Sequence, residues 1–139
     1  MTDIPAENLS PSWPAALDTR EPLPRVGEER ELLTAFLDWH RATFELKLTG
    51  LAAEQVAQRS VAPSGLSLHG LVRHLAGVER WWFALQFAGE QLPLLYYTDE
   101  QPDLDFDFAA AGVDLAADLA VWRAECARSR AIVAAAPPL

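Results

Sequence analysis

Hydrophobic residues recur at three- and four-residue steps in three long stretches of the chain, and this spacing predicts three amphipathic helices. The first helix is expected to begin near Gly27, where Glu28, Glu29 and Glu31 complement the positive end of a helix dipole. It is expected to loosen at Gly50. Its apolar stripe consists of Leu33, Phe36, Leu37, Phe44, Leu48 and Leu51.

The second helix is predicted to start after residue 63, with Ser64 or Ser67 as the N-cap, and to stop at Gly89. Its buried stripe is predicted to consist of Leu68, Leu71, Leu75, Val78, Trp82 and Leu85. A third helix is predicted for residues 113–135, before two consecutive prolines. Its stripe consists of Leu115, Leu119, Trp122, Cys126 and Val133.

The second helix carries two histidines on different faces. Arg73 and Arg80 fall opposite the apolar stripe, so we expect them in water. His69 lies towards that wet face, whereas His74 lies on the flank of the apolar stripe, beside Trp81 and Leu85. The pattern therefore makes His74, and not His69, the candidate functional histidine.

Residues 91–112, between the second and third helices, are predicted to form a loop because they contain two prolines and five acids. Asp103, Asp105 and Asp107 have the alternate spacing of a calcium loop, but the glycine and glutamate required further on are missing. We expect a solvated acidic loop with short turns.

Three long helices without a strand pattern predict an all-α bundle. Residues 1–26 hold five of the ten prolines and are interpreted as a leader, which leaves residues 27–139 as the helical domain. The aromatic residues near the end of the second helix add more apolar surface than three helices can hide. A fourth helix or a second chain is therefore expected to cover it.

The net charge of −9, from 20 acidic and 11 basic residues, argues against nucleic acid or an anionic membrane as a partner. No apolar run reaches the length of a membrane span, and the N-terminus lacks the pattern of a signal peptide. One cysteine, Cys126, fits a reducing cytoplasm.

The residues alone leave the chemistry of His74 open. A neutral imidazole on the inner flank of a bundle can serve as one metal ligand, but a catalytic zinc site uses three protein ligands. Periodicity favours a histidine packed between tryptophans with its nitrogen bonded to a neighbour. His40 could be a second ligand or a base, although a partly buried polar residue is the favoured interpretation. Cys126 is expected to be an inert packing residue.

Three segments, ERELLTAFLDWHRATFELKLTGLAAEQV, VAPSGLSLHGLVRHLAGVERWWF and YYTDEQPDLDFDF, resemble the actinobacterial branch of the DinB superfamily. Relatives of this branch include the mycothiol-dependent maleylpyruvate isomerase-like proteins. The resemblance covers residues 28–136 and implies an up-down-down-up four-helix bundle that commonly forms homodimers. It also implies a divalent metal, zinc or nickel, held by three side chains. One of these matches His74; the other two belong to a fourth helix without a counterpart in this chain.

The resemblance implies that the metal activates a thiol or a water molecule. We therefore expect a metal-dependent thiol S-transferase or hydrolase that acts on a small molecule, with mycothiol as co-substrate and His74 as a metal ligand. The alternative is a non-catalytic helical protein that lacks a complete metal site. Its exposed aromatic face would mediate self-association or bind a partner.

Overall fold

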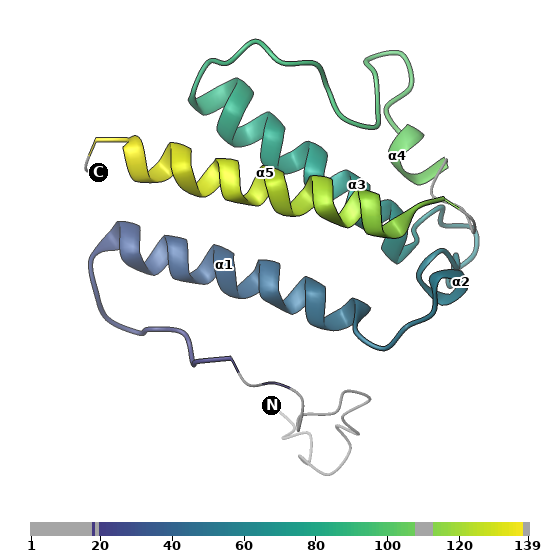
Figure 1. Cartoon of the computed structure of the whole chain (residues 1–139), viewed down its shortest axis with the longest axis horizontal. Coiled ribbons are helices and arrows are strands. Elements are labelled where there is room, and N and C mark those ends of the chain that lie inside the picture. The colour runs from purple at the N-terminus through teal and green to yellow at the C-terminus, as the bar shows by residue number, and fades with distance from the viewer. Residues whose placement is uncertain (1–17, 19, 108–112, 138–139) are drawn as a thin grey trace, which may run out of the picture. The chain divides into compact units, whose positions relative to one another are not determined.

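The computed structural model describes residue 18, residues 20–107 and residues 113–137, and every regular element in these ranges is a helix (Figure 1). The elements are α1 (Glu29–Leu48), α2 (Ala53–Val56), α3 (Leu68–Glu79), the π-helix η3 (Arg80–Phe87), α4 (Leu104–Asp107) and α5 (Leu115–Ala135). The prediction of an all-α fold with three long helices is confirmed, and it is consistent with a DinB-like helical bundle. No helix within the described ranges has the length and apolar character needed to cross a membrane.

The described residues divide into two compact units, the first ending at Thr49 and the second beginning at Gly50. In the first unit, Arg20 donates a hydrogen bond of 3.1 Å to the carbonyl of Trp39, and its guanidinium lies 4.2 Å from the centre of the Trp39 ring. The chain just before α1 is thus attached to the side of that helix. Most of the predicted leader lies outside the described residues.

The second unit is built on two parallel helices, α3 with its continuation η3, and α5 (Figure 1). Arg73 pairs with Asp118, and seven residues later in both helices Arg80 pairs with Glu125. Because both partners advance in the same direction, the two helices run parallel. This is the relation expected for the second and third helices of an up-down-down-up bundle, and it requires a long crossover connection.

Local sequence signals set the ends of these helices. The hydroxyl oxygen of Ser67 accepts a hydrogen bond of 3.0 Å from the amide of Gly70 and caps α3. Asp114 caps α5 in the same way through the amide of Ala117. Gly89 has a φ of 69°, in the left-handed region that glycine adopts without strain. The predicted N-cap at Ser67 and the predicted stop at Gly89 are confirmed.

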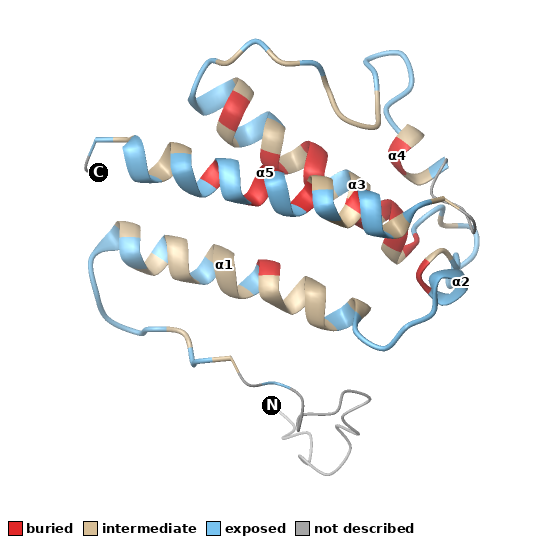
Figure 2. Ribbon diagram, in the orientation of Figure 1, coloured by how far each residue is buried: buried red, intermediate tan, exposed pale blue. Residues whose placement is uncertain are grey.

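The buried residues of the second unit are most numerous on α3 and α5 (Figure 2), and several of them are polar. Trp122 and Cys126 of α5 are buried, as predicted, and so are Val72 and Ala76 of α3, which lie outside the predicted stripe. The leucines of the stripe predicted for the second helix are only partly buried. Among the buried residues are also Asp118, Glu125 and Ser129 of α5, which lie at helical spacing on the same face.

The predicted exposure of four residues on the second helix was wrong. Arg73 and Arg80 were expected in water, but their side chains are only 14% and 16% exposed because α5 presents carboxylates to them. His69 was also expected at the surface and is 2% exposed. Trp82 was expected in the core and is 61% exposed. It lies in η3, where the wider π-helical turn shifts side chains off the α-helical stripe.

Candidate active site

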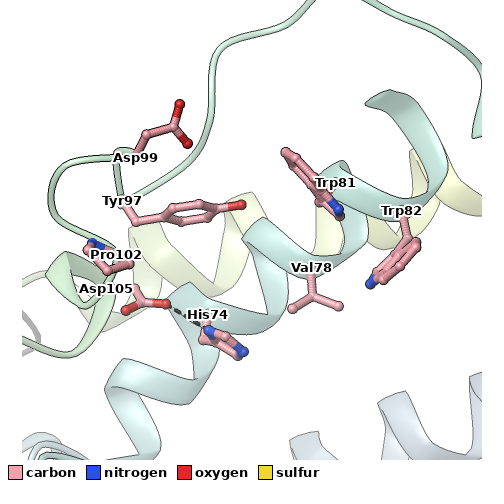
Figure 3. A pocket seen from close by; sticks show the side chains of 8 residues that line it. All are labelled: His74, Val78, Trp81, Trp82, Tyr97, Asp99, Pro102 and Asp105. Atoms are coloured by element: carbon pink, nitrogen blue, oxygen red, sulfur yellow. Dashed lines mark hydrogen bonds and ion pairs between the residues drawn. The ribbon is translucent and has the colours of Figure 1, made fainter. Parts of the chain in front are cut away.

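A pocket of about 380 Å³ lies beside His74, entirely within the second unit (Figure 3). This volume suits a small organic molecule. One wall comes from α3 and η3, and the other from the segment between η3 and the end of α4. The lining residues are His74, Val78, Trp81, Trp82, Tyr97, Asp99, Pro102 and Asp105.

The helical wall follows from the sequence spacing. His74, Val78 and Trp81 recur at steps of four and three, so they share one face of the helix. Trp82 joins them from the first turn of the π-helix. The prediction that Trp81 lies beside His74 is confirmed by this pocket, whereas Leu85, which was also predicted beside His74, does not line it.

Two glycines of α3 allow the opposite wall to approach closely. A Cβ atom on Gly70 would lie 2.5 Å from Cδ1 of Phe106, and a Cβ atom on Gly77 would lie 3.0 Å from Cε1 of Tyr97. Real Cβ contacts are longer than the first of these distances, so α4 packs on α3 at Gly70 only because the side chain is missing. The same gap at Gly77 lets the Tyr97 ring lie against the helix.

His74 and Asp105 form the central pair of the pocket. Nδ1 of His74 lies 2.8 Å from Oδ2 of Asp105 (Figure 3). The Asp105 side chain is 1% exposed, whereas that of His74 is 46% exposed. A buried carboxylate as partner fixes the proton of a neutral imidazole on Nδ1 and leaves the lone pair on Nε2, on the side of the ring away from Asp105.

The predicted solvated acidic loop was therefore wrong at Asp105. The short helix α4 carries this residue into the protein, while Asp103 and Asp107 remain exposed. Leu104 and Phe106, on either side of Asp105, were the available signal. Apolar neighbours indicate that a short acidic segment packs against something, and the ring of Phe106 lies 5.3 Å from that of His74.

Tyr97 adds a hydroxyl group to the pocket. Burial, together with the negative charges of Asp105 and Asp99, raises the pKa of Tyr97. Its hydroxyl therefore stays protonated at neutral pH and can donate a hydrogen bond to a bound molecule.

His69 belongs to a different cluster, which links α3 to α5. Its Nε2 lies 2.7 Å from Oδ2 of Asp118, and the same oxygen accepts a hydrogen bond of 2.8 Å from Nε of Arg73. The hydroxyl of Tyr96 donates to Oδ1 of Asp118 at 2.8 Å. Burial alone would raise the pKa of Asp118, but the hydrogen bonds from Arg73, His69 and Tyr96 outweigh it and lower this pKa.

This cluster also supports the pocket. Tyr96 has a φ of 61°, an uncommon backbone conformation for a residue with a side chain. Its hydroxyl is held by Asp118, and the Arg73 guanidinium lies 4.8 Å from the centre of its ring. The next residue is Tyr97, so Asp118 fixes the chain where it enters the pocket wall.

The other candidate residues lie outside this pocket. His40 lies on α1 in the first unit, is exposed rather than partly buried, and contacts the rings of Phe36 and Trp39. Cys126 is buried on α5, as predicted, and does not line the pocket.

The described residues do not make up the metal site that the resemblance implies. Within residues 18, 20–107 and 113–137, no three histidine, cysteine, aspartate or glutamate side chains lie close enough to share a metal ion. His74 can offer one nitrogen, and the nearby Asp105 carboxylate already holds the other nitrogen of the same ring. The role of His74 as a metal ligand stays a prediction.

Comparison with known families supports the resemblance found in the sequence. A family model described as mycothiol-S-transferase matches residues 32–139. The chain belongs to the mycothiol-S-transferase family. This is a DinB-like family, so the predicted DinB relationship is confirmed. Neither the search of curated proteins nor the search of solved structures found a match.

Proposed function

We propose that the protein is a mycothiol S-transferase that joins the sulfur of mycothiol to an electrophilic small molecule in the His74 pocket. Membership of the mycothiol-S-transferase family supports the co-substrate. The hydrogen bond between His74 and the buried Asp105, at the edge of the pocket, supports this pocket as the site of the reaction.

The pair has the geometry of a general base. Nε2 of His74 accepts the proton of the mycothiol thiol, and the resulting thiolate attacks the electrophilic carbon of the acceptor. A carbon–sulfur bond forms, and the leaving group departs with the electron pair of the bond that breaks. The proton on Nε2 then passes to the leaving group or to water. Asp105 orients the ring and stabilises the imidazolium that exists between these steps.

The remaining lining residues bind and orient the acceptor. Val78, Trp81 and Trp82 offer an apolar surface next to His74, and the Tyr97 hydroxyl offers one hydrogen-bond donor. Orientation matters because holding the acceptor near the thiolate replaces a bimolecular encounter by a reaction within one complex.

A metal ligand is the other role that His74 could have. Histidine ligands commonly donate their second ring nitrogen to a carboxylate, as Nδ1 does here to Asp105. Zinc or nickel would require two more protein ligands, and the described residues do not supply them. We therefore assign proton transfer, and not metal binding, to His74.

The test is the rate of mycothiol consumption with a neutral chloronitrobenzene, corrected for the uncatalysed reaction. His74→Asn should lower kcat/KM by about 10²–10⁴-fold, the contribution of a general base. His40→Asn, which changes an exposed histidine on α1, should leave the rate unchanged. A rate that disappears after chelation and returns with zinc or nickel would instead assign His74 to a metal.

A second candidate function is supported by the exposure of large aromatic residues on η3. Trp82 and Phe87 are 61% and 62% exposed, as expected for a surface that binds a second copy of the chain or another protein. A non-catalytic binding protein would form a stable homodimer, indifferent to chelators, and would not accelerate mycothiol conjugation. Light scattering and the conjugation assay together distinguish the two functions.

A further inference from the structure

Within the described part of the chain, the pocket is lined by acidic side chains and by no lysine or arginine. Asp99 and Asp105 line it, together with the neutral side chains of the aromatic wall, and none of the described lining residues is lysine or arginine. A bound molecule with a carboxylate, sulfonate or phosphate group would place its charge close to these two carboxylates with no described lysine or arginine beside it. The imidazolium that His74 forms during the proposed transfer is already paired with Asp105. Like charges brought together during desolvation oppose binding.

The arginines on the same helix do not compensate for this charge. Arg73 and Arg80 are directed towards α5, where they pair with Asp118 at 2.8 Å and with Glu125 at 2.6 Å. Both arginines are largely buried in these pairs, and neither lines the pocket. Moving either arginine into the pocket would leave its partner carboxylate buried without a counterion, which is costly.

The aromatic wall of the pocket favours apolar and cationic groups over anionic ones. Trp81 and Trp82 are consecutive, and both line the pocket because they lie in a π-helix, where neighbouring side chains are separated by a smaller angle than in an α-helix. Tyr97 faces them from the opposite wall (Figure 3). The faces of these rings attract planar apolar groups and cations. Asp99, which is exposed, can pair with a cation held there.

We infer that the acceptor substrate is a planar apolar electrophile without negative charge, and that a cationic group on it strengthens binding. This inference rests on the proposed function, because it names the substrate class for the same pocket. It excludes dicarboxylates and other anionic acceptors as good substrates.

The test uses three amides of 4-chloro-3-nitrobenzoic acid whose tails carry a neutral ethyl group, a carboxymethyl group or a trimethylammonioethyl group. The reacting ring is the same in all three, so each rate is divided by the uncatalysed rate with mycothiol. We expect kcat/KM for the anionic amide to be at least about tenfold below that for the neutral amide, a difference of about 1.4 kcal/mol. The kcat/KM for the cationic amide should exceed that for the neutral amide. Asp99→Asn should reduce any advantage of the cationic amide, and Asp103→Asn, at an exposed acid outside the pocket, should not.

A binding measurement separates this inference from the proposed function. The same three amides without the chlorine atom cannot react, and calorimetric titration gives their affinities. The order cationic, neutral, anionic in affinity supports the charge preference even if no conjugation is catalysed, in which case the transferase proposal is wrong. An anionic amide that binds or reacts as well as the neutral one overturns the inference.

Discussion

Asp105 is separated from His74 by 31 residues of sequence, yet its carboxylate holds Nδ1 of the imidazole at 2.8 Å. The carboxylate is buried and the imidazole is half-exposed, so the pair joins the inside of the second unit to its pocket. This contact gives His74 a defined tautomer and a defined orientation, which a general base requires.

The substitution Asp105→Asn preserves the shape of the side chain and removes its charge. An amide can hold Nδ1 but does not stabilise an imidazolium, so kcat should fall by about 10–100-fold with a small change in KM. The conjugation assay measures this directly. Asp103→Asn is the matched control, and equal rates for the two variants would remove Asp105 from the mechanism.

Gly70→Ala tests the close packing of α4 on α3. Alanine normally favours a helix over glycine, but here the new Cβ would lie 2.5 Å from the Phe106 ring. We expect a loss of about 1–3 kcal/mol in the free energy of unfolding, as for other overpacked sites. Conjugation activity should also fall, because displacement of α4 separates Asp105 from His74.

Gly65→Ala is the control for this substitution, since a Cβ atom there meets nothing within 4 Å. Its free energy of unfolding, measured by urea titration, should change by less than about 0.5 kcal/mol. If Gly70→Ala were as stable and active as Gly65→Ala, the contact between α3 and α4 would not support the site.

Asp118→Asn should be among the most destabilising single changes in the second unit. It removes the charge that His69, Arg73 and Tyr96 share and leaves the Arg73 guanidinium largely buried. Breaking a buried ion pair from one side costs about 3–5 kcal/mol. The control is Asp107→Asn, which changes an exposed acid 3.7 Å from Arg59. We expect it to lower the free energy of unfolding by less than about 1 kcal/mol.

The pKa of Asp118 predicts how the difference in the free energy of unfolding between the parent protein and Asp118→Asn depends on pH. Its folded-state pKa lies below the ordinary value of 3.8, so the unfolded chain takes up the proton first as the pH falls. Ionised Asp118 stabilises the folded protein fully well above pH 4. This stabilisation decreases as the pH falls through about 4 towards the pKa that Asp118 has in the folded protein.

Urea titrations of the parent protein and Asp118→Asn between about pH 6 and 3 measure this effect, since the other carboxylates cancel in the difference. The difference in the free energy of unfolding between the two proteins should be largest near pH 6 and should decrease in acid. A gap that widened in acid would mean that the pKa of Asp118 is raised and that the cluster does not favour its charge.

The sequence predicted the helices well because their signals are local. The N-cap at Ser67, the stop at Gly89 and the apolar spacing of the third helix each depend on residues within a few positions of one another. The burial of His69, Arg73 and Arg80 depends instead on which helix lies opposite. Asp118 and Glu125 have the same seven-residue spacing as Arg73 and Arg80, and this was the one signal that could have revealed the pairing.

The candidate site was predictable only in part. His74 and Trp81 share a helix, so their proximity follows from periodicity. Asp105 and Tyr97 reach the pocket through a crossover connection whose path no periodic pattern encodes. Trp82 was misplaced because a π-helical turn, which changes the register of every following side chain, leaves no clear mark in the sequence.

In the proposed mechanism, His74 takes the proton from the thiol of bound mycothiol. The most direct measurement is the ultraviolet difference absorbance of the thiolate when mycothiol is added to the protein at neutral pH. We predict that the parent protein and His40→Asn show the thiolate signal in proportion to bound mycothiol and that His74→Asn binds mycothiol without it. An undiminished thiolate signal in His74→Asn would contradict the assignment of His74 as the base.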